Sequence, residues 1–235
     1  MKSGKRILAV VPARGGSKGI KLKNLSQVNG KSLIEWVADC IRGLDFIDKC
    51  VVSTDHEGIV TESRRVGIDV PFIRPEHLSG DRVADVDVLI HALYQMEDQN
   101  RCIYDVILML QPTSPMRKHS HLIDVLDKLI GENFDSVLTV SRTDLWAHPL
   151  KQLLLDNGRI SYYAEEGKNV VARQQLKPTY HRNGIAYAIS RKCLTDQKTT
   201  IGENCGAVII DEEVVNIDSL DDLCRANELF KKRSG

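Results

Sequence analysis

Residues 7–25, near the N-terminus, constrain the fold of this chain more than any other stretch. Residues 7–11 are apolar and rich in β-branched side chains, and they give way to a segment rich in Gly, Ser and Lys. Such a change predicts a buried strand that ends in a loop whose backbone amides are free to bind an anion. The loop's cations are Arg14, Lys18, Lys21 and Lys23. Together they could neutralise one nucleoside triphosphate.

The spacing of this loop excludes the two common nucleotide-binding motifs. The chain has no G-x-x-x-x-G-K-[ST] here, and the glycines do not fit the dinucleotide pattern G-x-G-x-x-G. The alternative to a phosphate site is a solvated basic turn that joins a strand to a helix. Residue types and spacing alone leave both interpretations open.

Downstream of the loop, apolar runs typical of strands alternate with amphipathic patterns typical of helices. Ser32 and Glu35 form a capping box at the start of the first helical pattern, and Gly43 ends that pattern. The alternation predicts an α/β fold with a Rossmann-like, doubly wound and mostly parallel sheet in a single domain, residues 1–235. The expected strands are residues 7–11, 50–55, 70–73, 106–110, 134–140 and 206–210. Ligands bind at the carboxyl ends of strands in such sheets, so the basic loop should lie on the binding rim.

The composition excludes several classes of partner. Lys plus Arg and Asp plus Glu number 32 each, so no net field attracts nucleic acid or an anionic membrane. The six cysteines include no C-x-x-C pair and are expected to be reduced thiols. There is no signal-peptide core, and no apolar run approaches the ~20 residues of a membrane span. We therefore expect a cytoplasmic protein with no membrane partner.

Several separated motifs resemble those of one enzyme family, the CMP-sialic acid synthetases (acylneuraminate cytidylyltransferases). The loop segments that carry the resemblance are Pro-Ala-Arg-Gly-Gly-Ser-Lys-Gly-Ile at 12–20 and Lys-Asn-Leu at 23–25. The others are Arg-Pro-x-x-Leu-x-x-Asp at 74–81 and Leu-Gln-Pro-Thr-Ser-Pro at 110–115. Residues 173–178 and 180–189 are similar to the family's Arg-Gln-x-Leu-Pro and Arg-x-Asn-Gly-Ala-Ile-Tyr motifs, the second with Ile185 and Ala186 transposed. The related CMP-Kdo synthetases carry Gln-Gly-Asp-Glu-Pro in place of 111–115, which argues against their eight-carbon substrate.

The resemblance implies a nucleotidyltransferase-type fold and assigns roles to individual residues. The charge on the phosphates would be neutralised during catalysis by Arg14, Lys18 and Lys23. The nucleotide would be bound by Ala13, Gly15, Ser17, Asn24, Arg74, Ser79 and Asp81. The sugar would be bound by Gln111, Arg173, Asn183, Gly184 and Tyr187. Among these, Arg173 would bind the carboxylate of the sugar. The family's magnesium site carries over to Asp218 alone, because Asn216 replaces its first carboxylate.

Some of these assignments have a plainer alternative. Arg74 could belong to an ordinary surface connection, and Arg173 could be a solvated charge. Asp218 could simply be the N-cap of the last helix, a position that Asp favours. Asp85 stands where the family has a small hydroxyl residue, so a first-turn helix carboxylate is the better interpretation there.

Residues 145–178 interrupt the alternation of strand and helix patterns along the chain. Asn157-Gly158 between apolar runs predicts a β-hairpin, and a hairpin inserted here has little of its own to pack against. In the resembled family this insertion joins two subunits, so we expect a homodimer; the alternative is a hairpin that folds back on its own domain.

Taken together, the motifs predict a CTP-dependent cytidylyltransferase that uses Mg²⁺, CTP and a nonulosonic acid and releases pyrophosphate. A nucleotidyltransferase acting on a sugar phosphate, or a catalytically silent nucleotide-binding module, are the alternatives.

Overall fold

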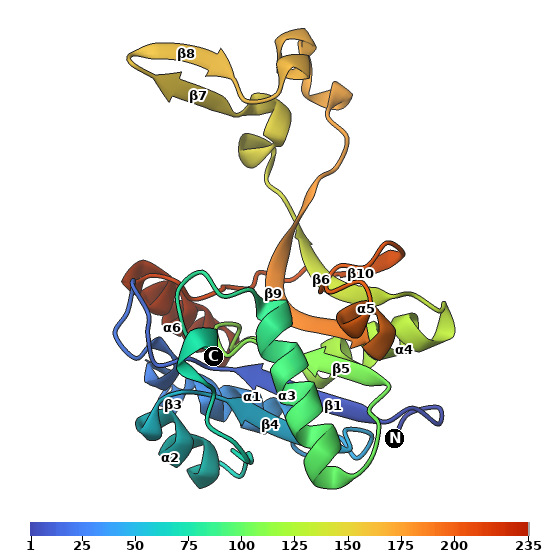
Figure 1. The fold of residues 1–235 in the computed structure, drawn as a ribbon. Coiled ribbons are helices and arrows are strands. Elements are labelled where there is room, and N and C mark those ends of the chain that lie inside the picture. Colours follow the sequence, from blue (N-terminus) through green and yellow to red (C-terminus); the bar gives the residue numbers. More distant parts are fainter. Residues whose placement is uncertain (235) are drawn as a thin grey trace.

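Residues 1–234 are described by a computed structural model, which has a six-stranded sheet between two layers of helices (Figure 1). In sheet order the strands are β10 (Cys205–Ile209), β6 (Ser136–Arg142), β9 (Tyr180–Ser190), β5 (Val106–Met109), β1 (Ile7–Pro12) and β4 (Lys49–Ser53). All neighbours are parallel except β9, which is antiparallel to both β5 and β6. The predicted α/β fold with a mostly parallel sheet is confirmed.

The helices divide between the two faces of the sheet. On one face lie α3 (Asp85–Asn100) and the short α5 (Arg191–Thr195), which are in front of the sheet in Figure 1. On the other face lie α1 (Leu33–Ile41), α2 (Glu57–Arg65) and α4 (His119–Gly131). The terminal helix α6 (Leu220–Ser234) packs beside α1, where Phe230 stacks on Trp36 with ring centroids 4.4 Å apart.

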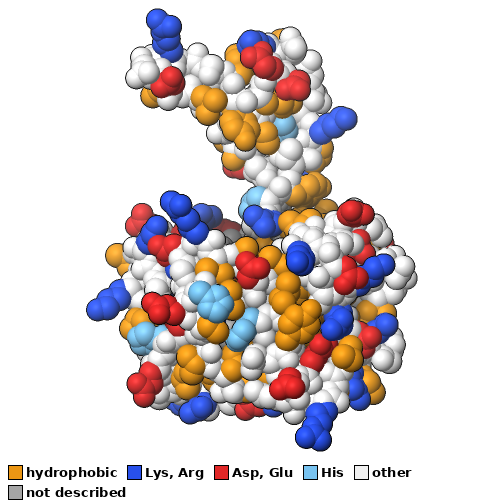
Figure 2. All heavy atoms as spheres, viewed as in Figure 1, with side chains coloured by type: hydrophobic (Ala, Val, Ile, Leu, Met, Phe, Trp, Pro, Cys, Tyr) orange, Lys and Arg blue, Asp and Glu red, His pale blue; other side chains and the backbone are white. Residues whose placement is uncertain are grey.

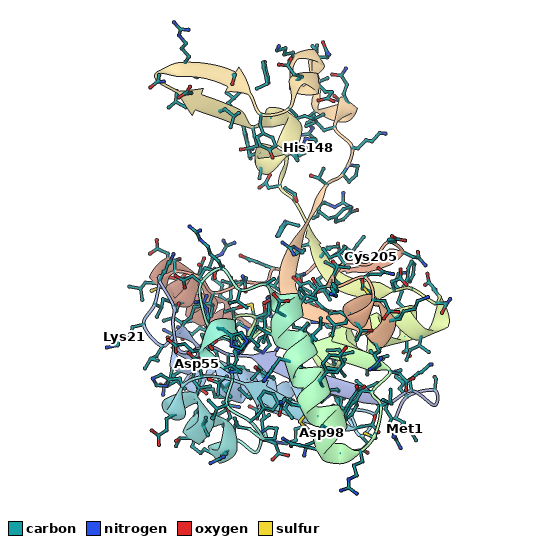
Figure 3. All side chains as sticks on the ribbon, in the orientation of Figure 1. Met1, Lys21, Asp55, Asp98, His148 and Cys205 are labelled. Atoms are coloured by element: carbon teal, nitrogen blue, oxygen red, sulfur yellow. The ribbon has the colours of Figure 1, made fainter. Side chains whose placement is uncertain are left out.

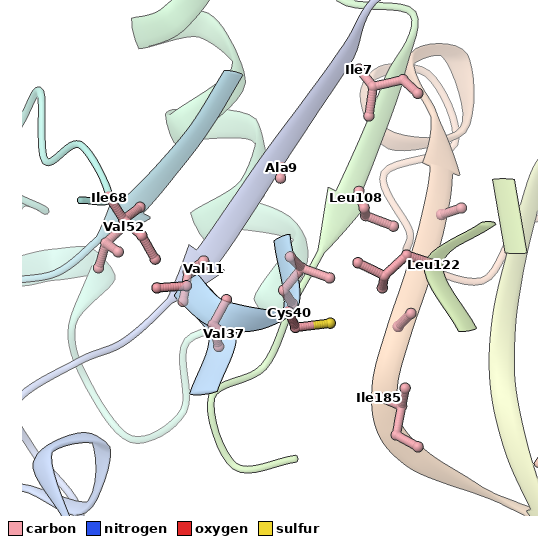
Figure 4. Packing of buried hydrophobic residues seen from close by; sticks show 14 of the residues in the cluster. Ile7, Ala9, Val11, Val37, Cys40, Val52, Ile68, Leu108, Leu122 and Ile185 are labelled. Carbon is pink, nitrogen blue, oxygen red and sulfur yellow. The ribbon is translucent and has the colours of Figure 1, made fainter. Parts of the chain in front are cut away.

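Strand β1 shows how the sequence pattern builds both cores. Its buried residues alternate: Ile7, Ala9 and Val11 face the α1 and α4 layer (Figure 4), whereas Leu8 and Val10 face α3. A strand buried on both faces needs a continuous apolar run, which residues 7–11 supply. The run therefore fixes β1 at the centre of the parallel part of the sheet.

Only one half of the capping box predicted at the start of α1 forms, because the Glu35 carboxylate pairs with Arg65. The Ser32 hydroxyl accepts a hydrogen bond from the Glu35 amide at 3.0 Å and so caps α1. The strand expected at residues 70–73 is wrong, because only isolated bridges form, between Val51 and Asp69 and between Thr54 and Ile73. Pro71 lies between them and has no N–H to extend a ladder, which explains the gap.

Residues 143–179, here called the arm, leave the body between β6 and β9 and stand away from it (Figure 1). The predicted insertion, 145–178, lies within the arm. The arm ends in a hairpin of β7 (Leu153–Asp156) and β8 (Arg159–Tyr162). Asn157 and Gly158 form its turn with φ values of 46° and 77°, the left-handed pair that a two-residue hairpin turn requires. Every residue of β7 and β8 is exposed in the single chain.

The cysteines and the membrane prediction can be examined over residues 1–234. All six cysteines lie in this part of the chain, and none is in a disulfide. Burial raises the pKa of Cys40 to about 11 and that of Cys50 to about 12, so these thiols stay protonated.

None of the helices in the described residues is both long and apolar enough to span a bilayer.

Candidate functional site

A cleft of about 300 Å³ opens at the carboxyl ends of β1 and β5. Its walls come from four separate segments: the basic loop after β1, residues 74–88, residues 111–113 and residues 216–218. A smaller cavity, which includes Lys18 and Gly19, continues from it along the loop. Parallel strands bring their carboxyl ends to one edge, and connections that diverge there leave a crevice. The cleft thus lies where the strand pattern places a ligand.

Three cations of the basic loop are each paired with a carboxylate at this cleft. Arg14 Nη1 lies 2.5 Å from Asp81 Oδ1, and Lys18 Nζ lies 3.0 Å from Asp81 Oδ2. Lys23 Nζ lies 2.7 Å from Asp218 Oδ1. Hydrogen bonds from Arg14 and Lys18 hold the pKa of Asp81 below its ordinary value. A ligand richer in negative charge, such as a triphosphate, could take the place of these carboxylates.

The three cations differ in how firmly they are held. The Lys23 side chain is 17% exposed, whereas the Lys18 side chain is 83% exposed. Lys23 is also the first residue of a short 3-10 helix, Lys23–Leu25. Lys21 is exposed at the outer edge of the body (Figure 3) and does not line the cleft. Lys23 is therefore the most preorganised of the loop lysines.

The nucleotide-binding candidates of the loop divide into two groups. Asn24 and Ser17 line the cleft, and the Asn24 amide donates to the Arg14 carbonyl at 3.0 Å. Ala13 is buried, and its N–H donates to the Ser53 carbonyl at 2.9 Å. Gly15 donates its N–H to Asp55 Oδ1 at 2.7 Å, outside the cleft lining. Ala13 and Gly15 therefore anchor the loop to the end of β4, and their amides are already used.

Arg74 is buried in the wall of the cleft. Its Nε donates to Ser53 Oγ at 3.0 Å, and its Nη2 donates to the Ser53 carbonyl at 2.5 Å. Burial lowers the pKa of Arg74 to about 10. The plain surface-charge interpretation does not fit this environment, because the guanidinium ties residues 74–81 to the sheet. Ser79 does not line the cleft. Its hydroxyl donates to the Pro75 carbonyl at 3.0 Å.

Two of the sugar-binding candidates meet at the far end of the cleft. Gln111 lines it and donates from Nε2 to Asp85 Oδ2 at 3.4 Å. Gly184 has a φ of 73°, and a Cβ built there would lie 2.8 Å from Gln111 Oε1 and 2.9 Å from Ser114 Oγ. The glycine thus allows β9 to pass close to the turn after β5.

The other three sugar-binding candidates lie elsewhere. Asn183 is buried and accepts from Thr139 Oγ1 at 2.6 Å, which fixes the irregular register of β9 against β6. Tyr187 is part of the core on the α3 face, and burial raises the pKa of its hydroxyl. Arg173 is exposed on the arm, outside the cleft of its own chain.

Arg117 was not among the residues selected from the sequence, and its side chain links the start of β9 to the segment after β5 at the cleft. Its Nε donates to the Ile185 carbonyl and its Nη2 to the Gln111 carbonyl, both at 2.5 Å. The side chain is buried, which lowers its pKa to about 10. No sequence signal separates such an arginine from a surface one, because one of its partners is the Ile185 carbonyl of β9, a strand distant in sequence.

The residues near Asp218 can be tested for a metal site. Within residues 1–234 no group of three or more His, Cys, Asp or Glu side chains is placed to hold an ion. Asp218 is 70% exposed, and Asn216 donates to its Oδ2 at 3.1 Å. Magnesium commonly binds through one or two carboxylates together with substrate phosphates, so this donor set fits Mg²⁺ only when a phosphate ligand is present.

The carboxylate of Asp218 does not cap α6. Asp222 Oδ2 accepts from the amides of Asp218 and Ser219, at 3.1 and 2.8 Å, and Ser219 Oγ accepts from the Asp222 amide at 3.2 Å. The N-cap alternative for Asp218 is therefore wrong, because Ser219 and Asp222 cap the helix.

Replacing Gly19 by alanine is expected to push the loop away from Asp218. A Cβ at position 19 would overlap the backbone carbonyl oxygen of Asp218, which has little room to move. Overpacking of this kind costs about 1–3 kcal/mol, so thermal denaturation should show a Tm several degrees lower. Gly16→Ala is the matched control, since its Cβ would lie an ordinary 3.7 Å from Arg14 Nη1. Equal Tm values for the two variants would contradict the close approach.

Known proteins similar to this chain include cytidylyltransferases. A family model described as cytidylyltransferase matches residues 8–203. The chain is 27% identical over 226 residues to pseudaminic acid cytidylyltransferase of Campylobacter jejuni, covering 95% of this chain and 96% of that protein. It is 28% identical over 231 residues to CMP-N,N'-diacetyllegionaminic acid synthase of Legionella pneumophila, covering 96% and 97%.

A solved structure of CMP:2-keto-3-deoxy-manno-octonic acid synthetase complexed with CTP has a TM-score of 0.74 to this chain. The two are 15% identical, and the match covers 97% of this chain and 99% of the other. At that identity the likeness concerns the fold. Because the family model spans most of the sequence, the chain belongs to the cytidylyltransferase family.

Proposed function

We propose that this chain transfers CMP from CTP to a nonulosonic (sialic-type) acid and releases pyrophosphate. One observation carries the proposal: Arg14, Lys18 and Lys23 converge on a cleft at the carboxyl rim of the sheet. The family, and the names of the relatives, support the class of acceptor. Within this class we propose an N-acylneuraminic acid; the motif at residues 110–115, which differs from that of the CMP-Kdo synthetases, supports an acceptor of the sialic type rather than the eight-carbon acid.

In the proposed reaction the anomeric hydroxyl oxygen of the acid forms a bond to the α-phosphorus of CTP. The bond from that phosphorus to the oxygen shared with the β-phosphorus breaks, its electron pair leaves with pyrophosphate, and the hydroxyl proton is released. Fixed cations stabilise the charge on the phosphoryl oxygens, and positioning supplies most of the remaining acceleration. Arg14, Lys18 and Lys23 would exchange their carboxylate partners for phosphate oxygens.

The other cleft residues would hold the substrates in place. Arg74, fixed by Ser53 in the cleft wall, and Asn24 are the candidates to contact the cytidine. We propose Mg²⁺ as the cofactor, held by Asp218 and by the phosphates. When bound, the ion would polarise the α-phosphoryl group and lower the pKa of the attacking hydroxyl. Lys23 and Asn216 already orient the Asp218 carboxylate toward the cleft.

A pyrophosphate-release assay tests the proposal directly. CTP, ATP, GTP and UTP are each offered with N-acetylneuraminic, legionaminic and pseudaminic acids, and without an acid. Release should require CTP and one of the acids. Release with a sugar 1-phosphate in place of the acids would favour a different nucleotidyltransferase. Absence of release with every pair, together with intact CTP binding, would favour a silent nucleotide-binding module.

Asp218→Asn is expected to raise the half-saturating magnesium concentration and to lower turnover, with little change in Tm. The carboxylate is exposed and caps no helix, so its loss should leave the fold intact. Asp222→Asn is the matched control, because Asp222 holds the start of α6 and such caps contribute about 1 kcal/mol. It should lower Tm and leave the magnesium dependence unchanged. The reverse pattern would remove Asp218 from the metal site.

We also propose that the active form is a homodimer joined through the arm. Every residue of β7 and β8 is exposed in the single chain, which supports this proposal. In such a dimer Arg173 could approach an acceptor bound to the other subunit, whereas it is remote from the cleft of its own chain.

A further inference from the structure

The transfer proposed above releases a proton from the attacking hydroxyl group, and a side chain placed to accept that proton would speed the step. Within residues 1–234 the cleft lining contains no histidine, and its carboxylates belong to Asp81, Asp85 and Asp218. Cations of the basic loop engage Asp81 and Asp218. Asp85 forms no ion pair in the described part of the chain, so its carboxylate is the one available as a base.

Substrate binding would not turn Asp81 or Asp218 into an equivalent base. Both carboxylates lie against the cations of the basic loop, where the phosphates would bind. In the proposed reaction Asp218 is also a ligand of the metal ion. The attacking hydroxyl belongs to the acceptor, so its base must lie on the acceptor side of the cleft.

Asp85 lies on that side. It is the first residue of α3 and lines the cleft. Within residues 1–234 its carboxylate takes part in one hydrogen bond, which Gln111 Nε2 donates to Asp85 Oδ2 at 3.4 Å. An acidic residue suits the first turn of a helix, as the sequence predicted, but that role alone does not require a place in the cleft. An acceptor held by Gln111 would have its hydroxyl groups beside Asp85.

The charged and titratable groups that face Asp85 come from two other segments. Arg74 lies in the cleft wall, and Arg182 and Tyr187 belong to β9. Desolvation by the surrounding walls raises the pKa of Asp85, and Arg182 and Arg74 lower it only in part. Burial and then the charge of Asp85 raise the pKa of the Tyr187 hydroxyl. Asp85 is therefore more basic than an ordinary aspartate, whereas Tyr187 stays protonated.

Asp85 also lies within reach of the nucleotide side of the cleft. Its charge acts on Arg74, a candidate to contact the cytidine, and it contacts Gln111, a candidate to contact the sugar. A nucleotide and an acceptor bound to these two residues would meet next to the Asp85 carboxylate. A general base needs this placement, because it must reach the hydroxyl proton while the oxygen approaches the phosphorus.

We propose that Asp85 is the general base of the transfer and takes the proton of the anomeric hydroxyl. This rests on the function proposed above. As the hydroxyl oxygen bonds to the α-phosphorus, its O–H bond breaks, the electron pair of that bond stays on the oxygen, and the proton passes to Asp85. Pyrophosphate leaves with the electron pair of its bond to the α-phosphorus. Asp85 then returns the proton to water, since it is exposed to solvent in the open cleft.

The experiment compares wild type, Asp85→Asn and Asp87→Asn by steady-state pyrophosphate release with CTP and the acid. Asparagine keeps an oxygen that can accept from Gln111 but is not a base, so the variant isolates proton transfer. Asp85→Asn should lower kcat by about 100-fold or more, with both Michaelis constants and Tm close to wild type. Asp87→Asn is the matched control, an exposed first-turn carboxylate of α3 outside the cleft lining. It should keep wild-type turnover.

The pH dependence of kcat separates a base from a residue with a structural role. Asp85 must be ionised to accept a proton, so wild-type kcat should fall as the pH drops through the pKa of Asp85. Because that pKa is raised, the fall should begin at a higher pH than for an ordinary aspartate. The fall should be absent from Asp85→Asn and unchanged in Asp87→Asn. An unchanged fall in Asp85→Asn would overturn the proposal.

The remaining outcomes also decide the matter. If Asp85→Asn raises the Michaelis constant for the acid and leaves kcat intact, Asp85 only contacts the acceptor or orients Gln111, and the proposal is wrong. If wild type releases no pyrophosphate with CTP and any of the acids, the proposed function fails, and the general base fails with it. An active wild type with an unaffected Asp85→Asn variant overturns the general base alone.

Discussion

Replacing Lys23 by alanine is expected to lower turnover with CTP by about 100-fold or more. Lys23 is the best buried lysine of the basic loop, and its ammonium group is already aimed at the cleft by Asp218, 2.7 Å away. Loss of one preorganised charge or donor at a reacting centre typically costs about 3 kcal/mol. Steady-state pyrophosphate release at saturating CTP and acid measures the effect.

Lys21→Ala provides the control for this prediction. The two lysines share the same loop, but Lys21 points away from the cleft (Figure 3). Its variant should keep wild-type turnover. Because Lys23→Ala leaves Asp218 without its ion pair, Tm is recorded for both variants. Near-normal turnover in Lys23→Ala would remove Lys23 from the phosphate site.

The double variant Leu153→Glu, Tyr162→Glu is expected to be a monomer that has lost most of its CMP transfer. The two residues lie directly opposite each other in the hairpin, and Leu155 and Ile160 form the next pair on the same face. All four are exposed in the single chain, and Figure 2 shows hydrophobic side chains on the surface of the arm. An isolated two-stranded hairpin is marginally stable in water, so this face needs a partner surface.

Sedimentation measures the mass, and calorimetry measures CTP binding to the same samples. Ser161→Glu is the matched control, because Ser161 pairs with Leu154 on the opposite face of the hairpin. It should remain a dimer with wild-type activity. The double variant should bind CTP normally, since the cleft lies in the body of each chain. A wild-type protein that is monomeric and active at nanomolar concentration would contradict the homodimer.

The core of the fold could be predicted from the sequence because its signals are local. Apolar runs and helix caps specify most of the strands and helices, and Asn157-Gly158 specifies the hairpin turn. The direction of β9 could not be predicted, since its run of apolar residues fits a parallel or an antiparallel neighbour equally well. The position of the arm could not be predicted either, because β7 and β8 are exposed and none of their residues belongs to the hydrophobic core clusters formed by the described residues.

The site shows the same division between local and distant contacts. The basic loop stood out because its residue types are concentrated in a few positions. Which residue caps α6 could not be predicted, because residues 218–222 offer several possible caps, and the hydrogen bonds in the structure assign that role to Ser219 and Asp222. Arg117 was missed for a related reason: its importance depends on its contact with the Ile185 carbonyl of β9, and no pattern within either segment records that contact.

The place of β9 in the sheet also has a consequence for the order in which the chain can fold during synthesis. Strands β5 and β6 both pair with β9, so each keeps an unpaired edge until the residues after the arm have been made. Exposed strand edges readily pair with other chains. While the arm is translated, the nascent protein therefore carries one unpaired edge on β5 and both edges of β6, because β6 pairs only with β9 and β10. The arm's length sets how long the edges that pair with β9 stay exposed.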